Sequence, residues 1–494
     1  MDSPLDDFEM FGVADLASLN PDLEFASDRE LKGVSPVIET ELIRIRDDPH
    51  FRRLFEMLSA LAMFPKGETF ESVRRFNGAK GFHAHDAKEL RRLALLDVSE
   101  VATLAGQVDK VLFVPIPVRD VLLGLMSTGE FSRNGTRALE AYFGVEWSTK
   151  GMSSSRVRID AATCPGWKIV NASAMVNRAV RSAIQEGEPR AIATCSRLTY
   201  LYASALEKGD HFRSNVAFLE ETLPVLRAAA SKAECDELAC LLAKSLRMSG
   251  RHEESLAALS DVNTAGLTRA SRQSFHYCSA ECHNSLGHTD DARLHAKKAI
   301  DADPESGTAL QSQALIIRLD GGSDRQVVSI ERKARKNKHG VLVRNILLDR
   351  AEGMDSEQAQ KILREVQYDA RVGRDSYNCI RASVRLARLQ LDAVGNVDDA
   401  TFNILLEGYQ VLHSDGSNLL FDRITGVLWD VFSVRGDLLN QISLFKHSSL
   451  RWRLRGGLGA ESKYVGLLKV ILERLGEQGM LEKADVVYVA SRLH

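Results

Sequence analysis

The feature that most constrains this chain is a recurrence of Gly-polar turns from about Ala191 onward. Stretches of a dozen or more residues with helical periodicity alternate with these turns. The turns are Lys208-Gly209-Asp210, Ser249-Gly250-Arg251, Leu286-Gly287-His288, Gly321-Gly322, Ala393-Val394-Gly395 and Arg435-Gly436-Asp437. Spacings of roughly 34 to 41 residues are typical of helix-pair repeats, in which each pair buries its apolar face only by stacking on its neighbours. The sequence therefore predicts an α-solenoid over residues 191–494.

One repeat, residues 279–304, identifies the class of solenoid. Small residues, a turn glycine and a closing proline stand at the offsets of the tetratricopeptide pattern. They are Ala280, Gly287, Ala292, Ala296, Ala299 and Pro304. Small side chains let two helices approach closely, and a proline ends the second helix. Earlier repeats match at fewer positions, and later ones match by helical period and turn alone, so we predict a tetratricopeptide-type array.

A unit with a different pattern, residues 36–129, precedes the repeats. Its apolar periodicity predicts helices over 51–64, 70–76 and 87–96. A β-like run at 111–114 and a fourth helix from about Val118 follow. Three helices followed by a strand pair is the order of a winged helix. The predicted fold class is therefore mainly α, with a winged-helix-like domain followed by a tetratricopeptide-type α-solenoid.

The remaining segments are an N-terminal arm and a connector. Residues 1–35 are acidic and are interrupted by Asn20-Pro21 and Ser35-Pro36, so we expect a disordered arm. An apolar stretch at 8–11 leaves docking on a partner as the alternative for part of it. Residues 130–190 form a helical connector, with helices over 131–143 and 171–187 and a short hairpin or loop over 146–159.

Composition agrees with a helical binding protein. Aromatic residues make up 6% of the 494 residues and there are 11 prolines, which favours helices over sheets. A formal net charge of −3 gives no overall attraction to nucleic acid or membrane. No apolar run approaches the ~20 residues of a membrane span. The seven scattered cysteines are expected to be reduced thiols, which indicates a cytoplasmic protein.

Three segments of the first unit resemble a known family. They are Leu-Ser-Ala-Leu-Ala-Met-Phe-Pro-Lys-Gly at 58–67, Glu-Leu-Arg-Arg-Leu-Ala-Leu-Leu at 89–96 and Val-Arg-Asp-Val-Leu at 118–122. Together they resemble the winged helix that follows the nucleotide-binding core of STAND ATPases, the NLR-like switch proteins. Bacterial members carry tetratricopeptide sensors after this domain, and residues 444–456 also resemble such sensor regions. The resemblance implies a sensor that acts in signalling or antiphage defence.

The chain departs from that family where nucleotide chemistry is concerned. No GxxxxGK[ST] motif occurs, and the glycines around 78–81 and 456–459 lack its spacing. The family places a nucleotide-contacting histidine near the end of the wing, and Pro115 stands at the matching position here. We therefore expect no ATPase activity, no enzymatic function and no cofactor. The expected partner is a protein, such as a separately encoded effector or NTPase, or a phage protein.

A zinc site on one predicted helix is the first of the sites we considered. Cys278 and Cys282 share a helix face, with His276 and His283 beside them. Structural zinc sites, however, take four ligands from two well-placed pairs. Because Cys282 adjoins the small packing residues of its repeat, we favour buried, inert cysteines and predict no metal site.

Two clusters of basic residues also have alternative interpretations. Arg332, Lys333, Arg335, Lys336 and Lys338 end one predicted helix. They form either an anion-binding patch or, as we favour, a solvated face beside a helix C-terminus. In the 87–96 helix, Lys88, Arg91 and Arg92 would contact DNA if this were a recognition helix. Since Asp86 and Glu89 offset this charge, we favour protein contact there and do not expect DNA binding.

The sequence thus predicts a non-catalytic sensor or adaptor that binds a protein through its helical repeats. The alternative is a winged-helix transcription regulator in which the repeats sense a ligand or partner. The candidate partner-binding residues are His276, His283, Asn284, Arg332, Lys333, Arg335 and Lys336. No membrane interaction is expected.

Overall fold

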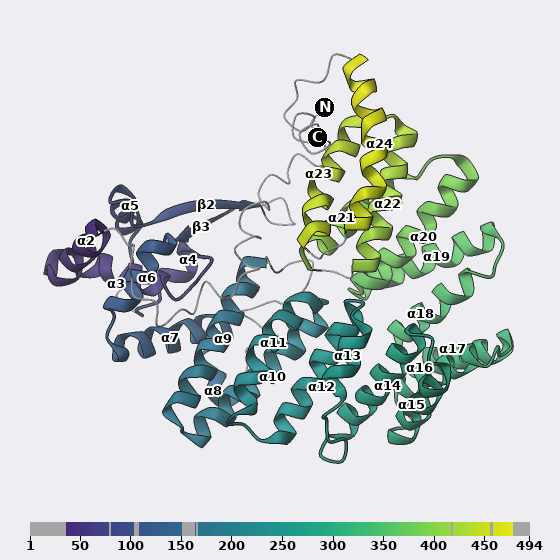
Figure 1. Ribbon diagram of the computed structural model, residues 1–494, viewed down its shortest axis with the longest axis horizontal. Helices are drawn as coiled ribbons and strands as arrows, with labels where there is room; N and C mark the ends of the chain where they lie inside the picture. Colours follow the sequence, from purple (N-terminus) through teal and green to yellow (C-terminus); the bar gives the residue numbers. More distant parts are fainter. Residues whose placement is uncertain are drawn as a thin grey trace. The chain divides into compact units, whose positions relative to one another are not determined.

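The structure, a computed structural model, describes residues 36–78, 81–102, 108–150, 164, 166–415, 418–454 and 458–477. The predicted arm, residues 1–35, lies outside them. The chain divides into two compact units. We call them the N-terminal unit, with described residues 36–209 and 217–238, and the C-terminal unit, with described residues 210–216 and 239–477. The regular secondary structure of the described residues is helical apart from one small sheet (Figure 1).

The N-terminal unit begins with the predicted helices and strands. Its first elements are α2 (Pro36–Asp47), η3 (Pro49–Phe51), α3 (Arg52–Leu61), β1 (Glu68–Thr69), α4 (Phe70–Val73), α5 (Ala84–Arg92), β2 (Asp97–Ala102), β3 (Val108–Phe113) and α6 (Ile116–Leu125). The strands form an antiparallel sheet in the order β1-β3-β2. Leu112 on the central strand pairs with Glu68 on one side and Val98 on the other. Helices followed by a strand pair, β2 and β3, stand in the order that the sequence predicted, and the assignment to a winged helix stays a prediction.

Four details differ from the sequence-based expectation. The short strand β1 and the helix α2 were not expected, because β1 has only two residues and α2 has a mixed polar pattern. Helix α4 ends at Val73, three residues before its predicted end. Helix α5 begins at Ala84 rather than after Asp86, because the Asp86 carboxylate accepts a hydrogen bond from the His83 backbone N–H (2.7 Å) in a capping box.

A buried polar network ties this sheet to the connector helices α7 (Thr128–Phe143) and α9 (Gly166–Glu186). The Tyr142 hydroxyl donates to the Glu68 carboxylate (2.5 Å), and the Asn171 amide donates to the carbonyl of Gly67 (2.7 Å). Gly67 has φ +75°, and a Cβ there would lie 2.3 Å from the Leu112 carbonyl oxygen. Glycine is therefore required where the chain enters β1.

The connector contains both predicted helices. Helices α7 and α9 confirm the predictions over 131–143 and 171–187, and one turn, α8 (Trp147–Lys150), lies between them. Most of the expected hairpin or loop over 146–159 lies outside the described residues. Ser127 starts α7 by a capping box with Glu130. The proposed domain boundaries at 129 and 190 remain predictions.

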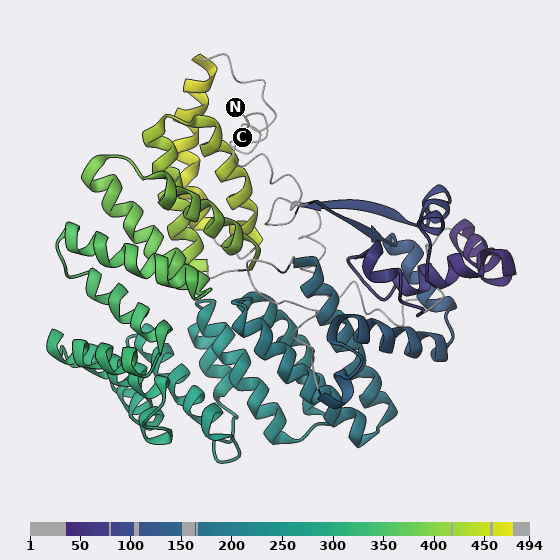
Figure 2. The ribbon, with the colours of Figure 1, turned by 180° about the vertical axis from the view of Figure 1, so that it is seen from behind.

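From Pro189 onward the helices alternate in antiparallel pairs. The first helices of the pairs are α10 (Pro189–Lys208), α12 (Lys232–Met248), α14 (Arg269–Ser285), α16 (Gly307–Leu319), α18 (Gly340–Ala351), α20 (Ser376–Val394) and α22 (Asn418–Arg435). The second helices are α11 (Phe212–Arg227), α13 (His252–Leu259), α15 (Thr289–Ala302), α17 (Asp324–Lys336), α19 (Ser356–Val372), α21 (Asp399–Asp415) and α23 (Leu438–Leu454), and α24 (Leu458–Glu477) follows. Figure 2 shows the later pairs from behind. This is the predicted α-solenoid.

The turns within pairs repeat the same geometry. Gly250 and Gly287 both have φ +81°, a left-handed conformation that favours glycine. After each, the next residue donates its N–H to a carbonyl five residues back: Arg251 to Leu246 (2.9 Å) and His288 to His283 (2.8 Å). The alanines that the repeat pattern singled out are buried, and Ala280, Ala292, Ala296 and Ala299 have no exposed surface. The predicted repeat register is therefore correct.

All seven cysteines are free, and each is buried, as expected for Cys278 and Cys282. Among the described helices, none combines the length and apolar character needed to cross a membrane.

Candidate binding surface

Successive first helices of the C-terminal unit are joined by a series of charged and aromatic side chains. We call it the first-helix ladder, and define it by Arg247, Tyr277, Glu281, Arg318, Asp349 and Arg381. These residues come from α12, α14, α16, α18 and α20, one or two from each helix. The ladder therefore runs across five consecutive pairs.

The ladder begins with an arginine beside an aromatic ring. The Arg247 guanidinium lies 5.8 Å from the centre of the Tyr277 ring, within range of a cation–π interaction. Its Nε is buried without a hydrogen-bond partner among the described residues. The Tyr277 hydroxyl donates to Glu281 (3.0 Å). Burial and the Glu281 carboxylate raise the pKa of Tyr277, so the hydroxyl stays a donor at neutral pH.

Ion pairs continue the ladder from one first helix to the next. Arg318 lies between two carboxylates, 4.0 Å from Glu281 and 3.4 Å from Asp349. Asp349 is also 3.8 Å from Arg381. Arg318 donates a long hydrogen bond to Asp349, and Arg381 also donates to Asn345 (2.9 Å) and Asn378 (3.1 Å). The Arg318 side chain is 51% exposed and that of Asp349 is 45% exposed, which makes both accessible to a partner.

Asp349 is partly desolvated by its neighbours, although its side chain stays accessible. Burial raises the pKa of its carboxyl group even though three arginines, Arg318, Arg381 and Arg385, act to lower it. Arg385 extends the ladder through Glu352 and the carbonyl of Leu348. A partner that brought hydrogen-bonding groups here would contact side chains already held in place by their neighbours.

Helix α14 carries three of the predicted site residues. Two of them, His276 and His283, face α15 rather than the first-helix ladder. His276 and His283 stand where the tetratricopeptide pattern has its Trp and Tyr, and both contact α15 of their own pair. Burial lowers the pKa of His276 to about 4. Asn284 lies three residues before the turn glycine, as do Arg247 and Arg318 in their repeats. Asn284 therefore occupies the same repeat position as the ladder residues Arg247 and Arg318.

The predicted basic run lies on α17, a second helix, and not beside the α14 residues. Arg332, Lys333 and Lys336 are exposed. Arg335 is paired with Glu331 (2.9 Å) and Glu365 (3.2 Å). Cations in the last turn of a helix are the arrangement favoured by its dipole.

The two cysteines of α14 do not form a zinc site with the histidines. Cys278 and Cys282 contact Ser255 on α13, at 3.5 and 3.3 Å, whereas His276 and His283 contact α15. The Cys282 thiol donates a hydrogen bond to the buried Ser255 hydroxyl. The hydrogen bond with Cys278 raises the pKa of Cys282, and burial raises it further, so this thiol stays protonated.

Sequence reasoning missed most of the ladder. Tyr277, Glu281, Asp349 and Arg381 do not form a motif, since they are far apart in the chain and meet only through stacking of the helices. The available signal was weak: Arg247 and Arg318 occupy equivalent repeat positions, each three residues before a turn glycine.

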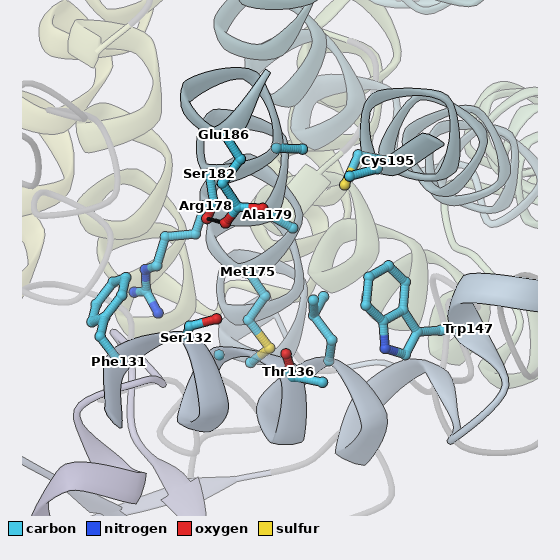
Figure 3. A pocket seen from close by; sticks show the side chains of 14 residues that line it. Phe131, Ser132, Thr136, Trp147, Met175, Arg178, Ala179, Ser182, Glu186 and Cys195 are labelled. Atoms are coloured by element: carbon cyan, nitrogen blue, oxygen red, sulfur yellow. Dashed lines mark hydrogen bonds between the residues drawn. The ribbon is translucent and has the colours of Figure 1, made fainter. Parts of the chain in front are cut away.

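The N-terminal unit contains a small cavity of about 190 Å³ between α7, α8, α9 and α10. Figure 3 shows Trp147, Met175 and Cys195 among the side chains that line it. Burial raises the pKa of the Cys195 thiol to about 11, so it is not a poised nucleophile. The cavity is smaller than the ~300 Å³ typical of the smallest ligand sites.

Comparisons with known proteins do not assign this chain to a family. No protein-family model matches the chain, and no curated protein matches it. A solved structure of a monomeric mutant of IFIT1 with m7Gppp-AAAA matches at 12% identity, over 89% of this chain and 91% of that one, with a TM-score of 0.27. Such a score is too low to support an argument about this protein.

Proposed function

We propose that this chain is a non-catalytic binding protein that holds a segment of another protein along its first-helix ladder. The observation that carries the proposal is the ladder itself: arginine, tyrosine and carboxylate side chains in contact across five consecutive first helices. Helical-repeat proteins use such extended surfaces to bind partners.

The physical chemistry of the ladder suits a polar polypeptide segment. Arginine forks and tyrosine rings dominate protein interfaces, because they combine apolar area with directed hydrogen bonds. Here Arg318 and Asp349 are held by neighbours yet remain half exposed. Since their conformations are already restricted, ordering them on binding costs less entropy than ordering free side chains. Donors and acceptors alternate, which matches the main chain and polar side chains of a peptide.

The biological setting follows from the family resemblance. Segments 58–67 and 89–96 resemble the winged helix of STAND proteins, and the repeats follow it in the same order as their sensors. We therefore place this chain as a sensor or adaptor in signalling or antiphage defence, acting in the cytoplasm. Its partner would be an effector or NTPase encoded elsewhere, or a phage protein.

Co-purification from the native host tests this function. The full chain is compared with the double variant Arg318→Ala/Arg381→Ala, and captured proteins are identified by mass spectrometry. We expect one protein captured by the wild type to be lost from the ladder variant. The matched control is Arg332→Ala/Lys333→Ala, which removes two cations from α17 and should leave capture unchanged. Loss with the α17 variant alone would assign binding to the basic run instead.

One observation favours the transcription-regulator alternative. Asp86, which was expected to offset the charge of α5, is only 2% exposed and is paired with Arg53 (2.7 Å). The exposed side of α5 therefore keeps Lys88, Arg91 and Arg92, and Glu89 pairs with Arg92 (3.0 Å). The charges on the exposed side of α5 therefore do not cancel, although the sequence suggested that they would. A basic exposed helix of this kind is suited to the DNA backbone.

Duplex DNA binding by the full chain separates the two functions. Sub-micromolar affinity at about 150 mM salt that falls steeply as salt increases would identify a nucleic-acid contact. Its loss in Lys88→Glu/Arg91→Glu would place the contact on α5, and the regulator function would then replace the adaptor function.

A further inference from the structure

A histidine cluster joins the two helices of the clearest repeat. His276 and His283 come from α14, His295 comes from α15, and His288 is the N-cap residue of α15. The rings of His276 and His295 are 5.4 Å apart, and those of His283 and His295 are 5.5 Å apart. Four imidazoles in one hairpin have no role in the ladder, which uses other side chains of α14.

At one end of this cluster, three side chains converge on a point. One ligand atom from each of His283, His288 and Asp291 lies within 4.8 Å of the other two. The two Nδ1 atoms of His283 and His288 are 3.5 Å apart. Tetrahedral zinc with bonds of about 2.1 Å separates neighbouring ligand atoms by about 3.4 Å. The histidine pair already has this separation.

The backbone fixes this geometry. Gly287 takes a left-handed conformation at the end of α14, and the His288 N–H donates to the His283 carbonyl (2.8 Å). This turn brings the two histidines side by side. Asp291 lies in the first turn of α15, one helical turn after His288, so its carboxylate lies on the same side of the helix. His288 and Asp291 are exposed and His283 is half-buried, which leaves the site open to solvent.

We propose that the α14–α15 hairpin binds a zinc-like divalent ion through His283, His288 and Asp291, with the fourth position left to water. Two imidazoles and a carboxylate form a ligand set that suits zinc, and that also suits nickel or copper. Magnesium and calcium prefer all-oxygen ligands and do not fit it. The sequence predicted no metal site, because the pattern considered there relied on Cys278 and Cys282.

The ion links the end of the first helix to the start of the second. His283 belongs to α14, whereas His288 and Asp291 cap and begin α15. Binding therefore stabilises the folded hairpin relative to the unfolded chain. The site also stands apart from the proposed function, because Tyr277 and Glu281 on the same helix contact neighbouring first helices instead.

Calorimetric titration of the full chain with zinc chloride tests the site. The protein carries no histidine tag, and the titration is done near pH 7.5. We expect one saturable zinc site per chain, no heat from magnesium or calcium, and an increase in Tm with zinc. His288→Ala and Asp291→Asn should each weaken zinc binding by about tenfold or more, since changes outside the ligand set alone can cost that much.

His50→Ala is the matched control, because His50 is also an exposed histidine but lies on η3. It should leave zinc affinity and the Tm shift unchanged. Both ligand variants change exposed side chains, and their own Tm without zinc shows that they fold. The absence of zinc binding to the wild type would overturn the proposal, as would binding that neither His288→Ala nor Asp291→Asn weakens.

Discussion

His413 on α21 is a histidine whose burial couples stability to pH. Its ring packs against Tyr409 and Phe421, with centroid distances of 5.8 and 6.0 Å, and its Nε2–H donates to the carbonyl of His447 (3.0 Å). Burial lowers the pKa of His413 to about 4, although the hydrogen bond to His447 acts to raise it, and the Arg451 guanidinium contributes to the decrease. The folded protein therefore holds this imidazole neutral.

We predict that replacing His413 makes the protein less sensitive to mild acid. An unfolded histidine titrates near pH 6.5, so its stabilising contribution is complete above that pH and is lost as pH falls toward 4. Between pH 7.5 and 5 the loss is about 2 kcal/mol. His413→Gln keeps an N–H donor but does not titrate. Urea unfolding at the two pH values should show a smaller decrease in the variant, and an equal decrease would contradict a depressed pKa.

At the scale of elements, the turn between α14 and α15 depends on a backbone conformation rather than on contacts. Gly287 has φ +81°, and a Cβ there would meet no atom within 4 Å. The cost of a side chain is therefore conformational strain alone. Gly466, in the middle of α24, is also free of neighbours but has no positive φ. The two glycines thus differ in backbone conformation and not in crowding.

We predict opposite effects of alanine at these two positions. Gly287→Ala should destabilise the protein by about 1–2 kcal/mol, because an L residue in the left-handed region brings its Cβ close to the carbonyl oxygen. Gly466→Ala should stabilise it by about 0.5–1 kcal/mol, because alanine favours a helix interior. Thermal melts of both variants against the wild type measure this. A stabilising Gly287→Ala would mean that the turn is not left-handed.

At the scale of the whole molecule, the sequence lacks the signature of a P-loop nucleotide site. No GxxxxGK[ST] motif occurs in the sequence, and the cavity among α7, α8, α9 and α10 is about 190 Å³. Pro115, where STAND winged helices carry a nucleotide-contacting histidine, is the N-cap residue of α6 and has no imidazole to offer. A phosphate cradle needs backbone N–H groups and a lysine held at its mouth.

We therefore predict that the chain neither binds nor hydrolyses Mg-ATP. Calorimetric titration with Mg-ATP should give only heats of dilution, and a phosphate-release assay should stay at the buffer rate. Micromolar binding would contradict this and would require a nucleotide site that does not use a P-loop.

The sequence alone determined most of the helices and their repetition. The Gly-polar turns marked where first helices end, and Ala280, Ala292 and Ala296 marked where the helices of one pair approach. These features are local: a turn glycine is required by its own φ, and an amphipathic period follows from 3.6 residues per turn. For the same reason α3, α4, α5 and the strand β3 were visible in the sequence, whereas two-residue β1 was not, because so short a strand has no periodicity.

Only the tertiary structure decided which side chains meet. The ladder joins Arg318 to Glu281 and Asp349, which lie on neighbouring first helices and are brought together by stacking. Asp86 counted as a surface charge in the sequence, but packing buried it against Arg53. A helical period says which residues share a face, but not which face a neighbour covers. That choice depends on how successive pairs pack, and the packing energy is shared among residues far apart in the chain.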